Sequence, residues 1–129
     1  MKLSAQTTSK ILIGLLCGVI LFHLCVLIGI IPANIVWGGQ FSAGNAIYIL
    51  EISSILMNTC LIWVLLLKGN WLKISFSPKA IHFILQIFLF LFILNTLGNL
   101  LAKSLLERFF ALLTALITWL LWKVIQHKV

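Results

Sequence analysis

The sequence has very little negative charge and few interruptions in its apolar runs. Only two acidic residues, Glu51 and Glu107, occur among 129 residues, against nine Lys and Arg. Charged residues make up 9% of the chain and hydrophobic residues 63%, with a mean hydropathy of +1.22. This composition excludes an ordinary soluble domain and indicates a chain that folds in a lipid bilayer. The positive residues are scattered at segment ends instead of forming a block, so we expect no nucleic-acid partner.

Cysteines and catalytic motifs are equally sparse. Cys17, Cys25 and Cys60 fall inside apolar stretches without a C-x-x-C pair, which argues against a disulfide scaffold or a disulfide-relay enzyme. No P-loop, dinucleotide fingerprint, nucleophile elbow or zinc-protease helix occurs. The histidines do not pair at one depth, as haem ligation between helices would need. We therefore expect no cofactor and no metal centre, and no motif indicates a particular reaction.

Four apolar windows are long enough, or nearly so, to cross a bilayer, which takes about 20 helical residues. They cover residues 11–31, 46–67, 80–102 and 109–125. Backbone polar groups in lipid must be paired within their own segment, so these spans are expected to be helices. The first window lacks a cleavage site and is longer than the apolar part of a signal peptide, so we expect it to be retained. The predicted fold is an all-α, integral membrane four-helix bundle forming one domain over residues 1–129.

The distribution of Lys and Arg over the loops predicts the orientation. One side would carry Lys2, Lys10, Lys68, Lys73, Lys79, Lys123 and Lys128, and the other only Lys103 and Arg108. Because positive loops stay in the cytoplasm, both termini are expected to be cytoplasmic in a multi-pass protein of the cell membrane.

Small residues form a stripe along the first span. Gly14 and Gly18 make a G-x-x-x-G motif, which Cys25 and Gly29 continue on about the same face. Such a stripe lets two helices approach closely. We expect it to pack against another span of the chain, with a second copy of the protein as the alternative partner.

Polar residues recur at similar depth in the predicted outer half of the bundle. Glu51, Ser54 and Asn58 follow one face of the second span, and Asn95 and Asn99 one face of the third. His23 on the first span and Thr114 on the fourth complete a candidate pocket. The uncharged loop residues Trp37, Gly38, Gly39 and Gln40 are expected to roof it.

Glu51 is the most informative residue, because ionisable groups inside spans are rare and costly. It either is held by Asn95, Asn99 or loop amides as a structural link between helices, or takes part in binding a ligand or a proton. His23, among apolar neighbours, is more simply a hydrogen-bonding packing residue than a functional group. Glu107 lies between Lys103 and Arg108 in sequence, so local ion pairs are expected to satisfy it.

Three segments together resemble a group of small bacterial four-helix membrane proteins of unassigned activity. They are Pro32-x-x-Ile-Val-Trp-Gly-Gly39, then Glu51 on the next span, and Asn95-Thr-x-Gly-Asn-x-x-Ala-x-x-x-x-Glu107. The resemblance covers nearly the whole chain and implies a bacterial inner membrane as the setting. It carries no activity, substrate or partner with it.

Three classes of function remain open. The first is an accessory protein that binds membrane lipids, a partner membrane protein or a second copy of itself, and it fits a chain with almost no soluble mass. The second is an oligomeric transporter of ions or small molecules that uses Glu51. The third, an intramembrane enzyme with Glu51 or His23 as acid or base, is the one we favour least.

Overall fold

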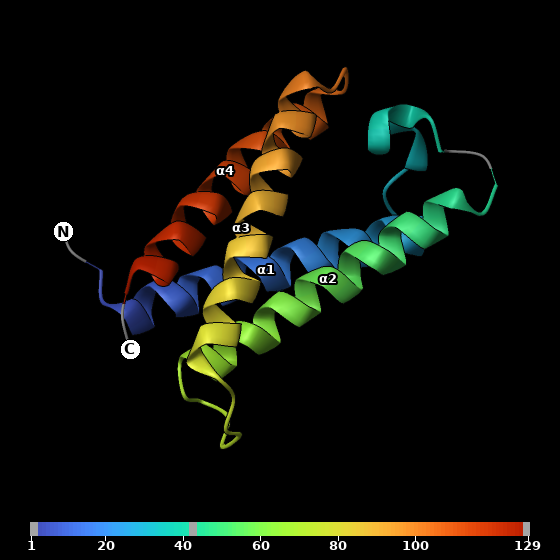
Figure 1. The fold of residues 1–129 in the computed structure, drawn as a ribbon. Coiled ribbons are helices and arrows are strands. Elements are labelled where there is room, and N and C mark those ends of the chain that lie inside the picture. The colour runs from blue at the N-terminus through green and yellow to red at the C-terminus, as the bar shows by residue number, and fades with distance from the viewer. Residues whose placement is uncertain (1–2, 42–43, 128–129) are drawn as a thin grey trace.

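The computed structural model describes residues 3–41 and 44–127 and is all-helical in these ranges. The helices are α1 (Ala5–Leu27), α2 (Ala46–Lys68), α3 (Pro78–Leu101) and α4 (Leu105–Gln126), with the short 3-10 helices η1 (Ala33–Ile35) and η2 (Trp37–Gly39) between α1 and α2 (Figure 1). All four long helices are long and apolar enough to cross a membrane, so the chain has the architecture of a multi-pass membrane protein. Lys2 and Lys128 of the charge count, and Ser42 and Ala43 of the first loop, lie outside the described residues.

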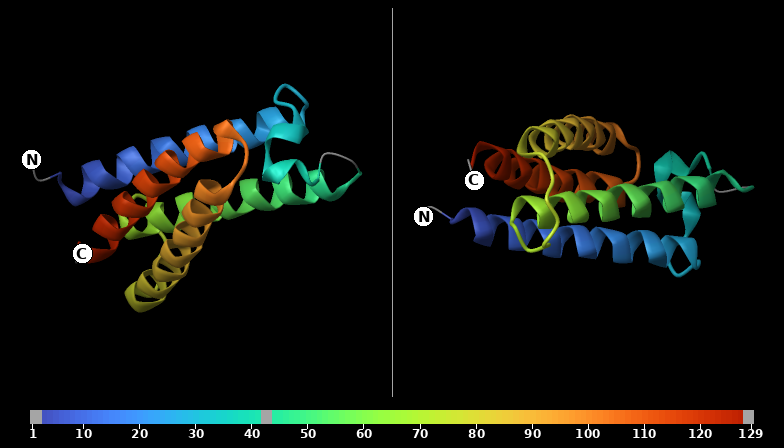
Figure 2. Two further views of the ribbon diagram at one scale, coloured as in Figure 1. Left: turned by 90° about the horizontal axis from the view of Figure 1, so that it is seen from above. Right: turned by 60° about the horizontal axis from the view of Figure 1, so that its bottom comes forward.

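The helices form two antiparallel hairpins, α1–α2 and α3–α4 (Figure 2). The hairpins meet at one end of the molecule and diverge at the other (Figure 1). We call the first the terminal end, because it carries both termini and the 69–77 connection, and the second the Trp37 end, because it carries residues 28–41 and the turn at 102–104. Across the two hairpins, α1 packs closely against α4, and α2 packs more loosely against α3.

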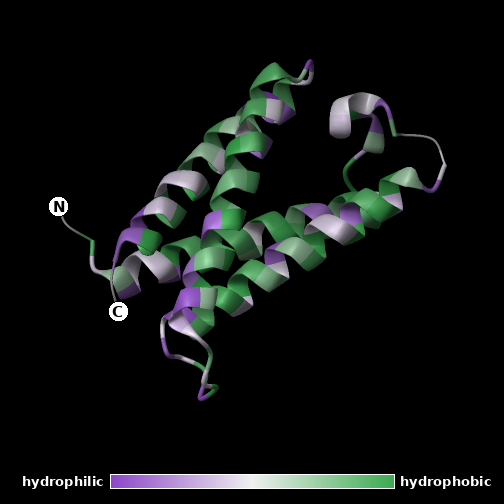
Figure 3. Cartoon of the chain, in the orientation of Figure 1, coloured by the Kyte–Doolittle hydropathy of each residue, from purple (hydrophilic) through white to green (hydrophobic). Residues whose placement is uncertain are grey.

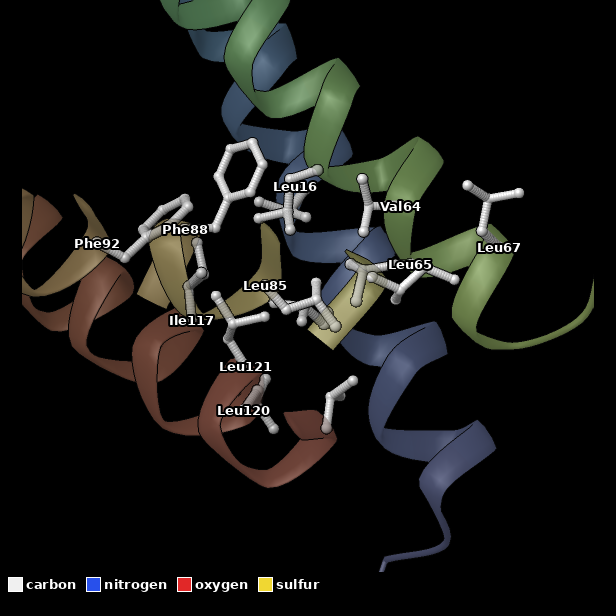
Figure 4. Close-up of a cluster of buried hydrophobic side chains, with 14 of the residues drawn as sticks. Leu16, Val64, Leu65, Leu67, Leu85, Phe88, Phe92, Ile117, Leu120 and Leu121 are labelled. Carbon is white, nitrogen blue, oxygen red and sulfur yellow. The ribbon is translucent and has the colours of Figure 1, made fainter. Parts of the chain in front are cut away.

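A leucine-rich core fills the region where the hairpins meet (Figure 4). Each long helix contributes a fully buried leucine to it, namely Leu16, Leu65, Leu85 and Leu121. The outward-facing sides of the helices are also largely apolar (Figure 3), as expected where lipid is the solvent. The packed core therefore lies towards the terminal end, and the space between the diverging hairpins lies towards the Trp37 end.

The helix boundaries differ most from the apolar windows in the first span. The helix α1 begins at Ala5, since Ser4 caps it by accepting a hydrogen bond from the Thr7 N–H at 3.1 Å. It ends at Leu27, because Gly29 adopts a left-handed φ of 85° that stops the helix before Pro32. Hydropathy identifies the apolar part of a helix that can lie in lipid. The first and last residues of the helix are instead set by polar caps and glycines.

The small-residue stripe does not pack against another helix of this chain, so that expectation is wrong. Gly14, Gly18 and Gly29 are exposed, and a Cβ atom added at any of them would meet no atom within 4 Å. Cys25 is only half-buried. The face of α1 that enters the core is the one with Leu12, Leu16 and Val19, because its larger side chains fill the space between helices. Contact of the stripe with a second copy stays a prediction.

Candidate functional site

A cavity of about 320 Å³ lies between the diverging hairpins. This volume lies within the range of small-molecule sites, roughly 300–1,000 Å³. Its wall includes all seven residues of the predicted pocket: His23, Glu51, Ser54, Asn58, Asn95, Asn99 and Thr114. Of the predicted roof, Trp37 lines the cavity, whereas Gly38, Gly39 and Gln40 are not part of its wall. The four helices and the first loop thus bring the polar stripes to one place.

Glu51 is fully buried and has a partner on each carboxylate oxygen. The Trp37 Nε1–H donates to Oε1 at 2.6 Å, and His23 Nδ1 lies 2.6 Å from Oε2. An ionised carboxylate only accepts, so Nδ1 then carries the proton of this second bond. Glu51 is therefore held by an indole from the loop and an imidazole from α1. The amides suggested by the sequence, Asn95 and Asn99, line the wall without a hydrogen bond to it.

Glu107, in the first turn of α4, is a second buried carboxylate of the cavity, with 9% of its surface exposed. Its Oε1 accepts a hydrogen bond from the Gly38 backbone N–H at 2.8 Å. The expected local ion pairs are wrong: among the described residues Glu107 pairs with neither Lys103 nor Arg108, and Arg108 Nε donates to the Ala102 carbonyl instead. The partial positive charge of a helix N-terminus further favours a carboxylate at this position.

Two adjacent residues of the first loop therefore hold the two carboxylates, one on each hairpin. We call this pair of bonds, from Trp37 to Glu51 and from Gly38 to Glu107, the Trp37–Gly38 clasp. It requires left-handed backbone at Trp37, Gly38 and Gly39, whose φ angles are 52°, 67° and 72°. Left-handed backbone is costly for a residue with a Cβ atom, so the surrounding contacts must hold Trp37 in place.

Two residues that line the cavity each have a buried polar side-chain atom without a hydrogen-bond partner in the described part of the chain. The two atoms are Glu107 Oε2 and Asn58 Oδ1. The Asn58 side chain is 8% exposed, and its Nδ2 donates to the Ser54 carbonyl at 2.7 Å. By contrast, the Thr114 hydroxyl is satisfied, since it bonds the Phe110 carbonyl and accepts from Thr96 Oγ1, both at 3.0 Å. Buried polar groups nearly always have partners, so the two orphaned acceptors need an explanation.

The cavity is least covered on the side between α2 and α3. There the lining residues Ser53 and Met57 of α2 and Leu91 and Asn95 of α3 are exposed. The lining residues from α1 and α4 are all buried or half-buried. Since α2 and α3 are also the neighbouring helices that touch least, the cavity is open to the outside of the molecule on this side.

The described part of the site has neither a basic side chain of lysine or arginine nor a cluster of metal ligands. No lysine or arginine of the described chain lines the cavity, which leaves its two carboxylates without a cationic side chain other than His23 when protonated. Within residues 3–41 and 44–127, no group of three or more His, Cys, Asp or Glu side chains is placed to hold a metal ion.

Comparisons of the chain with protein-family models, with curated proteins and with solved structures found no match. The comparisons therefore give no support to the resemblance to small bacterial membrane proteins. The structure is consistent with a small membrane protein through its four apolar helices, and the bacterial setting stays a prediction.

Proposed function

We propose that this protein binds an amphipathic ligand from the bilayer in the cavity between its hairpins. The polar head of the ligand lies among the polar residues of the wall, and its apolar part passes between α2 and α3 into the lipid. The observation that carries the proposal is the combination, in one cavity, of orphaned polar atoms with a side that is uncovered towards lipid.

The composition of the cavity wall fits such a ligand. Beside its polar groups, the wall has many apolar side chains. Four of them are phenylalanines from three helices: Phe22, Phe88, Phe92 and Phe110. Ligand sites in general combine apolar walls with a few placed polar groups. An orphaned buried acceptor costs on the order of 1–3 kcal/mol, and a ligand that supplies the missing donor removes that cost. Binding therefore stabilises the region where the hairpins diverge.

To test the proposal, a large side chain is introduced into the cavity by substitution, and the same substitution outside the cavity serves as the control. Ser54 lines the cavity, whereas Thr59, on the same helix, is exposed and does not. We expect native mass spectrometry of protein released gently from its membrane to show a bound amphiphile for the wild type and for Thr59→Phe. We expect Ser54→Phe to have lost it while still showing a cooperative unfolding transition, which indicates that the variant is folded. Equal occupancy in Ser54→Phe and Thr59→Phe would contradict the proposal.

A second candidate function, transport, is favoured by one observation. Glu51 also lines a separate cavity of about 440 Å³ at the Trp37 end, between the end of α1 and the start of α2. A carboxylate that borders two cavities is placed to pass a proton or cation between them. In proteoliposomes, this function predicts gradient-driven flux in the wild type that is lost in Glu51→Gln. If the wild type shows no flux but still binds its ligand, the transport function is contradicted and the binding function remains.

A further inference from the structure

We infer that the head of the bound ligand is a protonated amine and that no anionic group accompanies it into the cavity. This inference rests on the proposed binding function and names the chemical class of the ligand. It comes from what the cavity wall offers to a ligand: unoccupied acceptors, two carboxylates and no basic side chain of lysine or arginine.

The buried side-chain atoms of the wall that lack a hydrogen-bond partner are both acceptors. Both oxygens of Glu51 already have partners, so this carboxylate has little to offer a ligand. Glu107 Oε2 and Asn58 Oδ1 have none, and both side chains are more than nine-tenths buried. An oxygen acceptor is satisfied only by a donor, and an ammonium group carries up to three N–H donors and no acceptor. These two acceptors are therefore complementary to the donors of an amine.

The charges of the wall point to the same class. The two acidic residues of the sequence, Glu51 and Glu107, both line this cavity. A phosphate or carboxylate head would be placed beside Glu107 with no lysine or arginine of the described wall to balance either charge. Like charges repel strongly where water is excluded. An ammonium head instead forms a charge-assisted hydrogen bond with Glu107, and the aromatic rings of Phe22 and Phe110 lie on the same wall for cation–π contact.

The positions of the two acceptors define the orientation of the ligand. Glu107 lies beside Gly38 at the Trp37 end of the cavity. Asn58 lies seven residues beyond Glu51 on α2, which is about 10 Å further along the helix towards the terminal end. One ammonium group is too small to contact both Glu107 and Asn58 when they are separated in this way. The ammonium therefore belongs at Glu107, and a second donor of the ligand, such as a hydroxyl or amide N–H, reaches Asn58.

The test uses three amphiphiles that share one chain and differ in charge: dodecylamine, 1-dodecanol and dodecanoate. The full chain is placed in phosphatidylcholine nanodiscs, and saturable binding of radiolabelled dodecylamine is measured by scintillation proximity, with the unlabelled compounds as competitors. Empty nanodiscs correct for partition into lipid. We expect saturable binding of the amine, with dodecanol and dodecanoate at least about tenfold weaker as competitors.

The variants assign the binding to Glu107. Glu107→Gln keeps an oxygen for the Gly38 N–H but removes the charge, and we expect it to weaken dodecylamine binding about 10- to 100-fold. Lys103→Gln, which changes an exposed charge in the neighbouring turn, should leave the affinity within about twofold, because the residue is outside the cavity.

The possible outcomes separate this inference from the proposed function. If dodecanol or dodecanoate competes as well as dodecylamine in the wild type, the cavity binds amphiphiles but the amine assignment is overturned. If none of the three binds saturably, while the protein retains its unfolding transition, both the inference and the proposed function fail. Because the comparison of the three probes uses the wild type, a folding defect in Glu107→Gln does not affect it.

Discussion

Glu51 shows how a buried carboxylate is stabilised without a basic side chain of lysine or arginine. Its oxygens are held by the Trp37 indole and the His23 imidazole, each at 2.6 Å. Hydrogen bonds to charged groups contribute more than neutral ones, roughly 1.5–3 kcal/mol each. Removing one donor leaves a buried oxygen unsatisfied, so the two residues should contribute to stability far more than their packing alone would.

Replacing Trp37 by Phe tests this at the level of one bond. The ring still packs, but its N–H donor to Glu51 is gone, so we expect unfolding in detergent to require about 1.5–3 kcal/mol less free energy. Trp63→Phe is the matched control, since Trp63 is half-exposed near the terminal end and contacts Phe76 edge-on without an indole hydrogen bond in the described structure. Equal losses in the two variants would show that the Trp37–Glu51 bond does not stabilise the fold.

Sequence periodicity and depth selected seven polar residues that line the cavity, but they missed Glu107 and did not give the hydrogen bonds. Spacings of three, four and seven residues place Glu51, Ser54 and Asn58 on one helix face, and all three line the cavity. The partner of Glu107 could not be found in this way, because Gly38 lies 69 residues away in sequence and donates through its backbone. Lys103 and Arg108 were nearer in sequence, yet the start of α4 turns the Glu107 side chain inward and leaves both of them exposed.

At the scale of elements, apolar length predicts the helices well and their ends poorly. All four helices exist where the windows placed them, because about 20 apolar residues have few alternatives to a helix in lipid. The Ser4 cap and the left-handed Gly29 set the limits of α1, and neither is visible to hydropathy. The stripe with Gly14 and Gly18 was visible in the sequence, but its contact was not predicted correctly. A small-residue motif indicates a face suited to close packing and does not show which helix packs there.

The first loop depends on a close backbone approach that can be tested with two glycines. Gly39 has a φ of 72°, and a Cβ atom there would lie 2.9 Å from the Asn34 carbonyl oxygen. Gly44 has a φ of 85°, with open space around its Cβ position. Alanine at Gly44 should therefore cost only about 1–2 kcal/mol for left-handed backbone, and alanine at Gly39 should cost more because the loop must also shift.

This difference should appear in two measurements. Unfolding in detergent should show a larger loss of stability for Gly39→Ala than for Gly44→Ala. The emission of Trp37, measured in a background where the other tryptophans are replaced by Phe, should change in Gly39→Ala alone as the Trp37–Gly38 clasp moves. Equal effects of the two substitutions would mean that the close approach to Asn34 does not constrain the loop.

At the scale of the whole molecule, the site exists because the two hairpins pack at one end only. The leucine core holds them together towards the terminal end, and beyond it the helices diverge around the cavity. The Trp37–Gly38 clasp is the polar connection that spans the two hairpins at the open end. A tighter bundle would bury more apolar surface but would leave no volume for a ligand, so the divergence is expected to persist only if binding or the clasp offsets the lost packing.

Four membrane crossings would place both termini on one side of the bilayer, and the charge bias predicts which side that is. Lys10, Lys73 and Lys79 belong to the terminal end, whereas Lys103 and Arg108 belong to the Trp37 end. In a background with the three native cysteines replaced by alanine, single cysteines at the exposed positions Asn34 and Ser75 report the two ends. We expect an impermeant maleimide to label Asn34→Cys on intact cells and Ser75→Cys only after permeabilisation. The reverse pattern would invert the orientation and give the cavity a roof on the cytoplasmic side, and labelling of both on intact cells would contradict a structure that spans the membrane.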